Sequence, residues 1–278
     1  MNIGKYIELY SNDLKLKNYS QNTIDNYCSQ VKCFLEHFNS VATKPSEISE
    51  SKIKEWLLLA KSINGRKHRI SAVKLFYKYT GKQPLKFKHI EYPRSDKKLP
   101  IVLSQSEIQN MFDVCENTKH KLILALLYSC GLRVSELINL KWVNIDRGRM
   151  VINILKAKGN KDRQVMLSEN IIPLMEKYWR EYKSKEYIFN GQKYLQYTDR
   201  SVLEVVKQLA TKAGIDNKRV YTHLIRHCAF THLVENGTDI NIIQKLAGHS
   251  NVKTTMIYTH ISHNIISKIN SPLNSINL

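Results

Sequence analysis

The sequence predicts a mainly α-helical fold with one small β-sheet, divided into two domains. Apolar residues recur at the three- and four-residue spacing of amphipathic helices through most of the 278 residues. Two short β-rich runs, 150–155 and 163–167, flank the turn AKGNK and are typical of a hairpin or small sheet. A basic, proline-containing stretch at 91–100 separates two helical regions, and a chain of this length is comfortable for two domains.

The first ninety residues are expected to form a domain of helices. Ser20 suits a helix N-cap, and the residues after it place apolar side chains at helical spacing, namely Ile24, Tyr27, Val31, Phe34, Leu35 and Phe38. The turn-forming segment 40–49 separates this helix from a second helix around residues 53–58. A third helix is expected from about Arg66 to Tyr79.

The third helix carries an almost purely basic set of residues between its apolar positions. These candidate DNA-binding residues are Arg66, Lys67, Arg69, Lys74 and Lys78. A charged helix face is usually only solvated, but a face of one sign favours contact with phosphates.

Residues 91–100, with the sequence EYPRSDKKLP, are expected to be a linker. Proline prevents helix continuation, and the charges resist burial. The predicted domains are therefore residues 1–90 and 101–278.

The second domain begins with a clear helix start signal. Ser104 followed by Glu107 matches a capping box ahead of an apolar helical pattern. A strongly apolar helix, KLILALLYSCG, then ends at Gly131. Beyond the predicted hairpin, further helices are expected at 169–185, 198–213, 223–235 and 239–247.

The charge of the chain points to a polyanionic partner. Lysine and arginine total 43 against 24 acidic residues, which gives a net charge of +19 spread through the whole chain. Such an excess suits counterion release from DNA or RNA, although acidic lipid or solubility alone would also fit.

Other features of the composition predict a cytoplasmic protein without a membrane partner. No run approaches the roughly 18 apolar residues that span a membrane. The N-terminus lacks the apolar core of a secretory signal. The five cysteines are scattered and odd in number, which is typical of a reducing compartment and predicts no disulfide framework.

Five short segments of the second domain combine residue types that suit phosphoryl chemistry. Two arginines can hold the non-bridging oxygens of a phosphate, and a histidine can accept a proton from a nucleophile. A lysine on a tight turn can protonate a leaving oxygen, and a tyrosine hydroxyl can attack phosphorus without a metal ion. The segments are GLRVSEL at 131–137, KGNKDR at 158–163, HLIRH at 223–227, GHS at 248–250 and the region of Tyr258, nine residues past His249.

The order and spacing of these segments resemble the signature motifs of the tyrosine recombinase (phage integrase) family, close to its Xer-type bacterial members. The likeness covers the second domain through GLRVSEL, KGNKDR, HLIRHCAFTHLVENG and LAGHSNVKTTMIYTH. The segment NGRKHRISAVKLFYKY resembles the SAM-like core-binding domain of the same family. The resemblance implies an N-terminal SAM-like helical domain and a mixed α/β catalytic domain of the DNA-breaking-rejoining fold.

The resemblance also implies how the site would hold a phosphate. Arg133 and Arg226 would clamp the scissile phosphate, and His249 would hydrogen-bond one of its oxygens. Glu136 stands where the family has an acidic residue after the first arginine, and it would support the site rather than react.

The remaining implied roles belong to the reacting groups. Tyr258 would be the nucleophile, giving a 3′-phosphotyrosyl link and a free 5′-hydroxyl, and His223 would be its general base. Lys158 would protonate the leaving 5′-oxygen. Lys156 and Lys161 compete with Lys158 for this role, because only geometry settles such a choice.

No metal or other cofactor is expected. His223 and His227, four residues apart on a helix, could bind zinc, but leucine follows His223 where a zinc protease motif has glutamate. No carboxylate or cysteine joins the C-terminal histidines at ligand spacing.

Three functions are consistent with these residues and with the resemblance. The first is a site-specific recombinase that exchanges strands as a tetramer on two double-stranded DNA sites, alone or paired with a homologous recombinase. The second is a type IB topoisomerase-like enzyme that nicks and reseals DNA, and the third is a non-catalytic DNA-binding repressor. The last 20 residues contain Ile265, Ile266 and Ile269 at helical spacing, which would fit a helix that packs within the same chain. The resemblance implies instead that this C-terminal helix docks into a neighbouring subunit.

Overall fold

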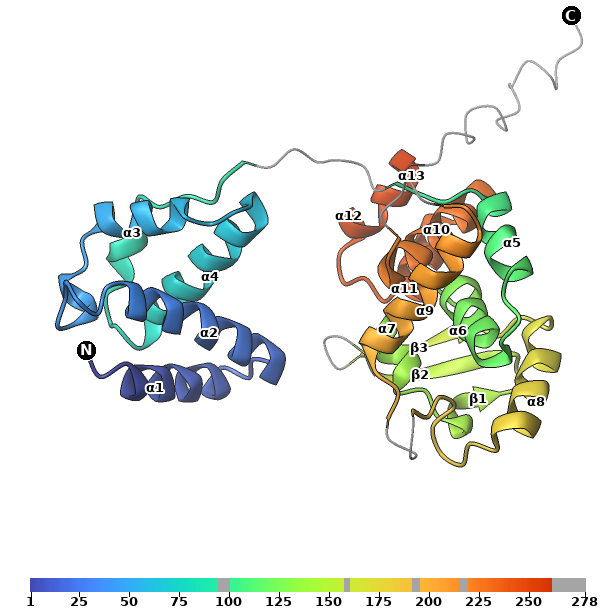
Figure 1. The fold of residues 1–278 in the computed structure, drawn as a ribbon. Helices are drawn as coiled ribbons and strands as arrows, with labels where there is room; N and C mark the ends of the chain where they lie inside the picture. The colour runs from blue at the N-terminus through green and yellow to red at the C-terminus, as the bar shows by residue number, and fades with distance from the viewer. Residues whose placement is uncertain (95–100, 158–160, 192–195, 216–219, 262–278) are drawn as a thin grey trace, which may run out of the picture. The chain divides into compact units, whose positions relative to one another are not determined.

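The computed structural model describes residues 1–94, 101–157, 161–191, 196–215 and 220–261. The chain divides into two compact units, Met1–Lys97 and Lys98–Leu278, and each unit has its own hydrophobic core. Helices dominate both units, and the strands of the described residues lie in the second (Figure 1).

In its described residues, 1–94, the first unit contains four α-helices (Figure 1). Each begins after a polar residue whose side chain accepts a hydrogen bond from the first turn, which satisfies a backbone N–H that the helix leaves free. The helices are α1 (Ile3–Leu16), α2 (Gln21–His37), α3 (Glu50–Leu58) and α4 (Ile63–Tyr79), with short 3-10 helices at Pro45–Glu47 and Pro84–Phe87.

Aromatic side chains from these helices meet in the centre of the first unit. Phe34, Phe76 and Tyr77 are fully buried and pack edge to face. Tyr10 of α1 donates a hydrogen bond to the carbonyl of Ala72 at 2.8 Å. These contacts hold α4, which carries the basic residues, against α1 and α2.

The second unit joins helices to a three-stranded antiparallel sheet in the order β1-β2-β3 (Figure 1). Strand β1 (Ile145–Asp146) pairs with β2 (Val151–Ala157), which pairs with β3 (Lys161–Met166). The helices are α5 (Gln105–Asp113), α6 (Thr118–Ser129), α7 (Val134–Ile138), α8 (Ile171–Tyr182), α9 (Asp199–Lys212), α10 (Thr222–Glu235), α11 (Ile240–Ala247), α12 (Val252–Thr255) and α13 (Ile257–Ile261), with a 3-10 helix at Trp142–Asn144.

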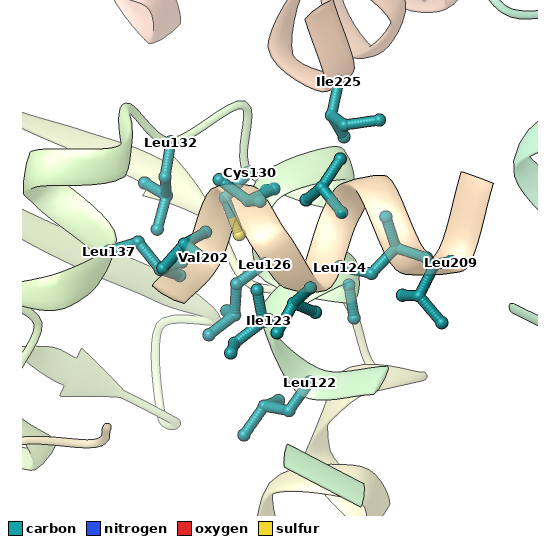
Figure 2. Packing of buried hydrophobic residues seen from close by; sticks show 14 of the residues in the cluster. Leu122, Ile123, Leu124, Leu126, Cys130, Leu132, Leu137, Val202, Leu209 and Ile225 are labelled. Atoms are coloured by element: carbon teal, nitrogen blue, oxygen red, sulfur yellow. The ribbon is translucent and has the colours of Figure 1, made fainter. Parts of the chain in front are cut away.

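Helix α6 forms the centre of the second unit. Its residues 122–127 are all buried, so this helix is apolar on every side. It packs against α7, α8, α9 and α10. Figure 2 shows its side chains in one cluster with Val202 and Leu209 of α9 and Ile225 of α10. The core thereby fixes the starts of α7 and α10, which carry the candidate arginines.

The predicted fold class, mainly helical with a small sheet, is confirmed. The capping box of Ser104 and Glu107 is present, with the Ser104 N–H donating to Glu107 Oε2 at 2.8 Å. Several features differ from the sequence prediction. Helix α1 has no counterpart among the three helices expected in the first unit. Helix α4 begins at Ile63 rather than near Arg66, because Ser62 caps it, and the two-residue strand β1 is too short to leave a pattern.

In the part of the chain that the structure describes, no helix has the length and apolar character needed to cross a membrane.

Candidate active site

Arg133 is the N-cap residue of α7, just after the turn that ends α6. Its backbone N–H and its Nη1 both donate to the carboxylate of Glu136, each at 2.8 Å. Its Nη2 donates to the carbonyl of Ala247, at the end of α11, at 3.0 Å. These three bonds fix the guanidinium between α7 and α11, with its side chain 18% exposed.

Glu136 is buried among arginines. Its carboxylate accepts Nη1 and Nη2 of Arg163 at 2.6 and 2.7 Å, and it lies 4.0 Å from Nη1 of Arg226. Burial raises the pKa of Glu136, but the hydrogen bonds and charge of Arg163, and the bonds from Arg133, outweigh it and hold the pKa at about 2. Glu136 is therefore ionised at neutral pH and offsets part of the surrounding positive charge.

Arg226 on α10 is completely buried. Its Nη1 donates to the carbonyl of Gly131, and its Nη2 donates to that of Ala247 at 2.5 Å. Burial and then the charge of Arg133 lower the pKa of Arg226 to about 10, so it stays a cation at neutral pH. Among the described residues its Nε finds no hydrogen-bond partner, which leaves a donor for a ligand.

His249 follows Gly248, which ends α11 in the left-handed conformation with a φ of 62°. Its Nδ1 lies 3.0 Å from the hydroxyl of Thr255, a buried residue of α12. Burial lowers the pKa of His249 to about 4, and the charges of Arg226 and Arg133 add to this effect. The ring is therefore neutral at pH 7.

Tyr258 on α13 is buried beside these groups, with only 1% of its surface exposed. Its ring stacks on His249, with the ring centroids 6.2 Å apart and the planes 14° from parallel. His227 and Phe230 of α10 lie against it at centroid distances of 5.7 and 5.5 Å. Burial raises the pKa of Tyr258, while the charges of Arg226 and Arg133 oppose the rise.

His223 and His227 lie one turn apart on the same face of α10, with ring centroids 4.7 Å apart. His223 is exposed, whereas His227 is half-buried against Tyr258. Burial lowers the pKa of His227 to about 4, with the nearby His223 and Arg226 contributing. Within the described ranges, no hydrogen-bond partner reaches its Nδ1. The two histidines lie between the buried Tyr258 ring and the surface of α10.

Five of the six candidate catalytic residues from the sequence are thus linked by contacts, namely Arg133, His223, Arg226, His249 and Tyr258. The sixth, Lys158, lies outside the described residues, so its role as general acid stays a prediction. The competing lysines, Lys156 and Lys161, are placed only by their backbone in β2 and β3. No group of three or more histidine, cysteine or acidic side chains that could hold a metal ion is found in the described part of the chain.

Two side chains of this site had no role in the sequence prediction. Arg163 belongs to the KGNKDR motif, but its partner Glu136 is 27 residues away and no local pattern connects them. Thr255 is buried and pairs with His249, and in the sequence it is one of several threonines near Tyr258. A hydrogen-bond partner fixes which ring nitrogen of a histidine carries the proton. The need of His249 for such a partner is the signal that could have pointed to Thr255.

The predicted DNA-binding residues of α4 differ in the exposure of their side chains. Lys74 and Lys78 are exposed, while Arg66 and Lys67 are half-buried. Arg69 donates to the carbonyl of Trp56 at 2.9 Å and stacks 4.4 Å above the Trp56 ring. Arg69 therefore helps to hold α4 on α3, and its contact with DNA stays a prediction, as it does for the other four.

Family comparisons identify the class of protein that carries this fold and site. The phage integrase family model matches residues 102–264, and the model of the phage integrase N-terminal SAM-like domain matches residues 7–86. The chain belongs to the phage integrase family of tyrosine recombinases.

Individual relatives narrow the resemblance to Xer-type proteins. Tyrosine recombinase XerA of Pyrococcus horikoshii is 32% identical over 92% of this chain and 89% of its own length. Tyrosine recombinase XerD of Oceanobacillus iheyensis is 31% identical over 88% of this chain and 90% of its own. The chain is accordingly an Xer-like tyrosine recombinase, an enzyme of site-specific DNA recombination, and the relatives do not favour the topoisomerase-like or repressor alternatives.

Solved structures agree with this family assignment. A crystal structure of XerA recombinase has 30% identity and a TM-score of 0.57, covering 96% of each chain. XerH recombinase bound to a palindromic difH substrate, in a post-cleavage complex, has a TM-score of 0.75 over 94% of this chain and 83% of its own. At 23% identity, the XerH structure supports the fold alone.

Proposed function

We propose that this recombinase cuts and rejoins duplex DNA through a covalent bond between Tyr258 and the 3′-phosphate at the cut. The observation that carries the proposal is the convergence of two guanidinium groups beside one buried tyrosine. Arg133 and Arg226 both donate to the carbonyl of Ala247. Ala247 packs in the same apolar cluster as Tyr258.

The two arginines suit the scissile phosphate in charge and in donors. A charged phosphate oxygen is a stronger acceptor for guanidinium N–H groups than a neutral carbonyl such as that of Ala247. The Nε of Arg226, without a partner among the described residues, adds a donor. Both cations would also neutralise the charge that grows on the non-bridging oxygens in the transition state.

His249 would provide a further hydrogen bond to the phosphate. Its low pKa keeps the ring neutral at pH 7, so only one ring nitrogen carries a proton. When the Thr255 hydroxyl donates to Nδ1, the single proton of the His249 ring lies on Nε2. His249 can then donate from Nε2 to a phosphate oxygen.

The cleavage step exchanges one phosphodiester bond for another. The Tyr258 oxygen forms a bond to phosphorus, and the bond from phosphorus to the 5′-oxygen of the next nucleotide breaks. The phenolic proton passes to His223 as general base, and Lys158 gives a proton to the departing 5′-oxygen. The products are a 3′-phosphotyrosyl bond and a free 5′-hydroxyl, and attack by a 5′-hydroxyl reverses the step.

Tyr258 must be uncovered before it can react. The phenol is 1% exposed and packs against three rings in the DNA-free chain. A phosphate in duplex DNA cannot reach a group buried to this extent, and the same holds for the fully buried Arg226. We infer that DNA binding or assembly shifts α13 relative to α10, which would limit cleavage to assembled complexes.

The partner is DNA, as the net charge of +19 and the DNA-bound recombinases of similar fold support. We propose that the basic residues of α4 bind phosphates while the second unit holds the cleavage site. Strand exchange would take place in a tetramer on two DNA sites, formed by four copies or with a homologous recombinase.

A suicide substrate tests the catalytic proposal. The DNA is a duplex that the Tyr258→Phe protein selects from a randomised pool, then nicked next to each candidate cleavage position so that the short 5′-hydroxyl fragment diffuses away. We expect wild-type protein to accumulate a covalent adduct that resists denaturing electrophoresis. Tyr258→Phe should form none, because phenylalanine has no oxygen to attack phosphorus.

The matched control is Tyr182→Phe on α8, where the tyrosine is 38% exposed. This variant should form the adduct at the wild-type rate. Loss of the adduct in both variants, or its persistence in Tyr258→Phe, would contradict the proposal.

A further inference from the structure

Arg163 is a buried arginine of β3 that reaches out of the sheet into the cleavage site. Its backbone pairs with Ile154 of β2, and its side chain is 7% exposed. Strand β3 packs against α11, which ends just before His249. A buried guanidinium carries a large desolvation cost unless its donors are paired, so its partners show what holds it there.

The first partner of Arg163 is the carboxylate of Glu136. Both terminal nitrogens donate, Nη1 to Oε1 at 2.6 Å and Nη2 to Oε2 at 2.7 Å, which is the parallel two-bond geometry of a strong arginine–carboxylate pair. The same carboxylate accepts the backbone N–H and Nη1 of Arg133. Arg163 therefore fixes the carboxylate that orients Arg133.

The second partner is the end of α11. The Nε of Arg163 donates to the carbonyl of Leu246 at 2.8 Å. The next carbonyl along the chain, that of Ala247, accepts both Arg133 and Arg226. Arg163 thus holds the backbone one residue before the point where the two candidate phosphate-binding arginines meet.

The aliphatic part of Arg163 also supports the turn that leads to His249. Gly248 has a φ of +62°, and a Cβ atom built on it would lie 3.0 Å from Cδ of Arg163. The Arg163 stem therefore packs closely against the backbone of this turn. The Arg163 side chain therefore contacts both the carboxylate that orients Arg133 and the turn that leads to His249, although strand β3 carries neither of these residues.

We propose that Arg163 is a positioning residue for DNA cleavage, acting on Arg133 through Glu136 and on the His249 turn through Leu246. This proposal rests on the proposed roles of Arg133 and His249 at the scissile phosphate. Each of the three guanidinium nitrogens of Arg163 donates to a protein acceptor, and we expect it to act without touching the DNA.

The test uses the full-length protein at saturating concentration and measures the single-turnover rate of covalent adduct formation on the suicide substrate. Arg163→Met keeps the length of the stem and removes the donors. We expect its rate to fall about 10- to 100-fold, because a small displacement of a phosphate-binding group costs this much in rate. DNA affinity should stay within about 3-fold, since Arg163 makes no DNA contact in this account.

A second substrate separates positioning from general destabilisation. In a scissile methylphosphonate, a methyl group replaces one charged oxygen, so less positive charge is needed in the transition state. The Arg163→Met defect should shrink to less than about 3-fold on this substrate. Arg163→Lys, which keeps the charge and can make one of the two bonds, should show a smaller loss with the same dependence on the substrate.

Arg149→Met is the matched control, because the Arg149 side chain is 79% exposed and its closest acidic partner is 3.9 Å away. Its rate should equal that of the wild type on both substrates. An unchanged rate in Arg163→Met, or equal losses on phosphate and methylphosphonate DNA, would overturn the positioning role. An absent adduct in the wild type would instead refute the proposed function, so the two failures are distinguishable.

Discussion

Three arginines share one carboxylate in the cleavage site, and this sets the electrostatics at the scale of single residues. Arg133 and Arg163 donate to Glu136, and Arg226 lies 4.0 Å from it. Without the carboxylate the guanidinium groups would repel one another at short range in a buried region. The charge of Arg133 already lowers the pKa of Arg226. A DNA phosphate would bring the negative charge that this cluster still lacks.

The neutral His249 makes the stability of the second unit depend on pH. Its folded pKa of about 4 lies below the ordinary value of 6.5. As the pH falls, the unfolded chain therefore takes up a proton first. Stability is full above about pH 6.5 and is lost towards pH 4. At pH 5 the loss should be about 1–2 kcal/mol from this residue.

Urea unfolding of the wild type and of His249→Gln at pH 7 and pH 5 checks this expectation. The variant lacks the titrating ring, so its free energy of unfolding should fall less between the two pH values. Parallel losses in the two proteins would show that His249 is not held neutral by its surroundings.

At the scale of elements, the turn between α6 and α7 joins the core to the site. Gly131 has a φ of +57°, and a Cβ atom built there would lie 2.6 Å from Cζ of Phe230. The carbonyl of Gly131 also accepts a hydrogen bond from Arg226. This turn therefore positions Arg133 and Arg226 at the same time.

Gly131→Ala should weaken both stability and cleavage. The left-handed conformation and the collision with Phe230 together predict a loss of about 1–3 kcal/mol in the free energy of unfolding. The cleavage rate should also fall, because Phe230 packs against Tyr258 and beneath Arg226. Urea unfolding and the suicide-substrate rate measure the two effects.

Gly214→Ala is a matched control for the strain alone. Gly214 has a φ of +72°, and a Cβ atom there would meet nothing within 4 Å. It should cost about 1 kcal/mol in stability while leaving the cleavage rate unchanged. Equal effects of both substitutions on cleavage would contradict the role given to the Gly131 turn.

The sequence predicted elements better than the contacts between them. Helices such as α5 and α9 follow local rules, because caps and apolar spacing lie within a few residues. The roles of the candidate catalytic residues came from motif resemblance, and the candidate DNA-binding residues of α4 came from the charge pattern of that helix. Arg163 and Thr255 were not predicted. The Arg226 donors, in contrast, reach acceptors 95 and 21 residues away, and no local pattern encodes such pairs. The burial of Tyr258 likewise depends on how α13 packs on α10.

At the scale of the whole molecule, we propose that the two units divide DNA binding and chemistry. Basic residues of α4 belong to the first unit, and the candidate catalytic residues belong to the second. The C-terminal segment, 264–278, which the sequence predicts to dock into a neighbouring subunit, lies outside the described residues. A helix predicted from its three isoleucines at helical spacing would need a partner surface, because a short isolated helix is not stable in water.

Deletion of residues 264–278 should abolish strand exchange between two sites and leave specific DNA binding intact. Recombination of a two-site plasmid and a gel-shift titration measure the two properties. Full recombination by the truncated protein would refute the docking role. Loss of DNA binding would show that the segment serves the fold of the second unit instead.

The central claim is that Tyr258 alone becomes bonded to the DNA, through the 3′-phosphate. The most direct measurement is mass spectrometry of the covalent adduct after nuclease and trypsin digestion, with end-labelling of the released strand. The account predicts that the nucleotide mass is attached to the peptide containing Tyr258 and that the released strand has a free 5′-hydroxyl. Attachment to another residue, or a 3′-hydroxyl instead of a 5′-hydroxyl at the newly cut end of the released strand, would contradict it.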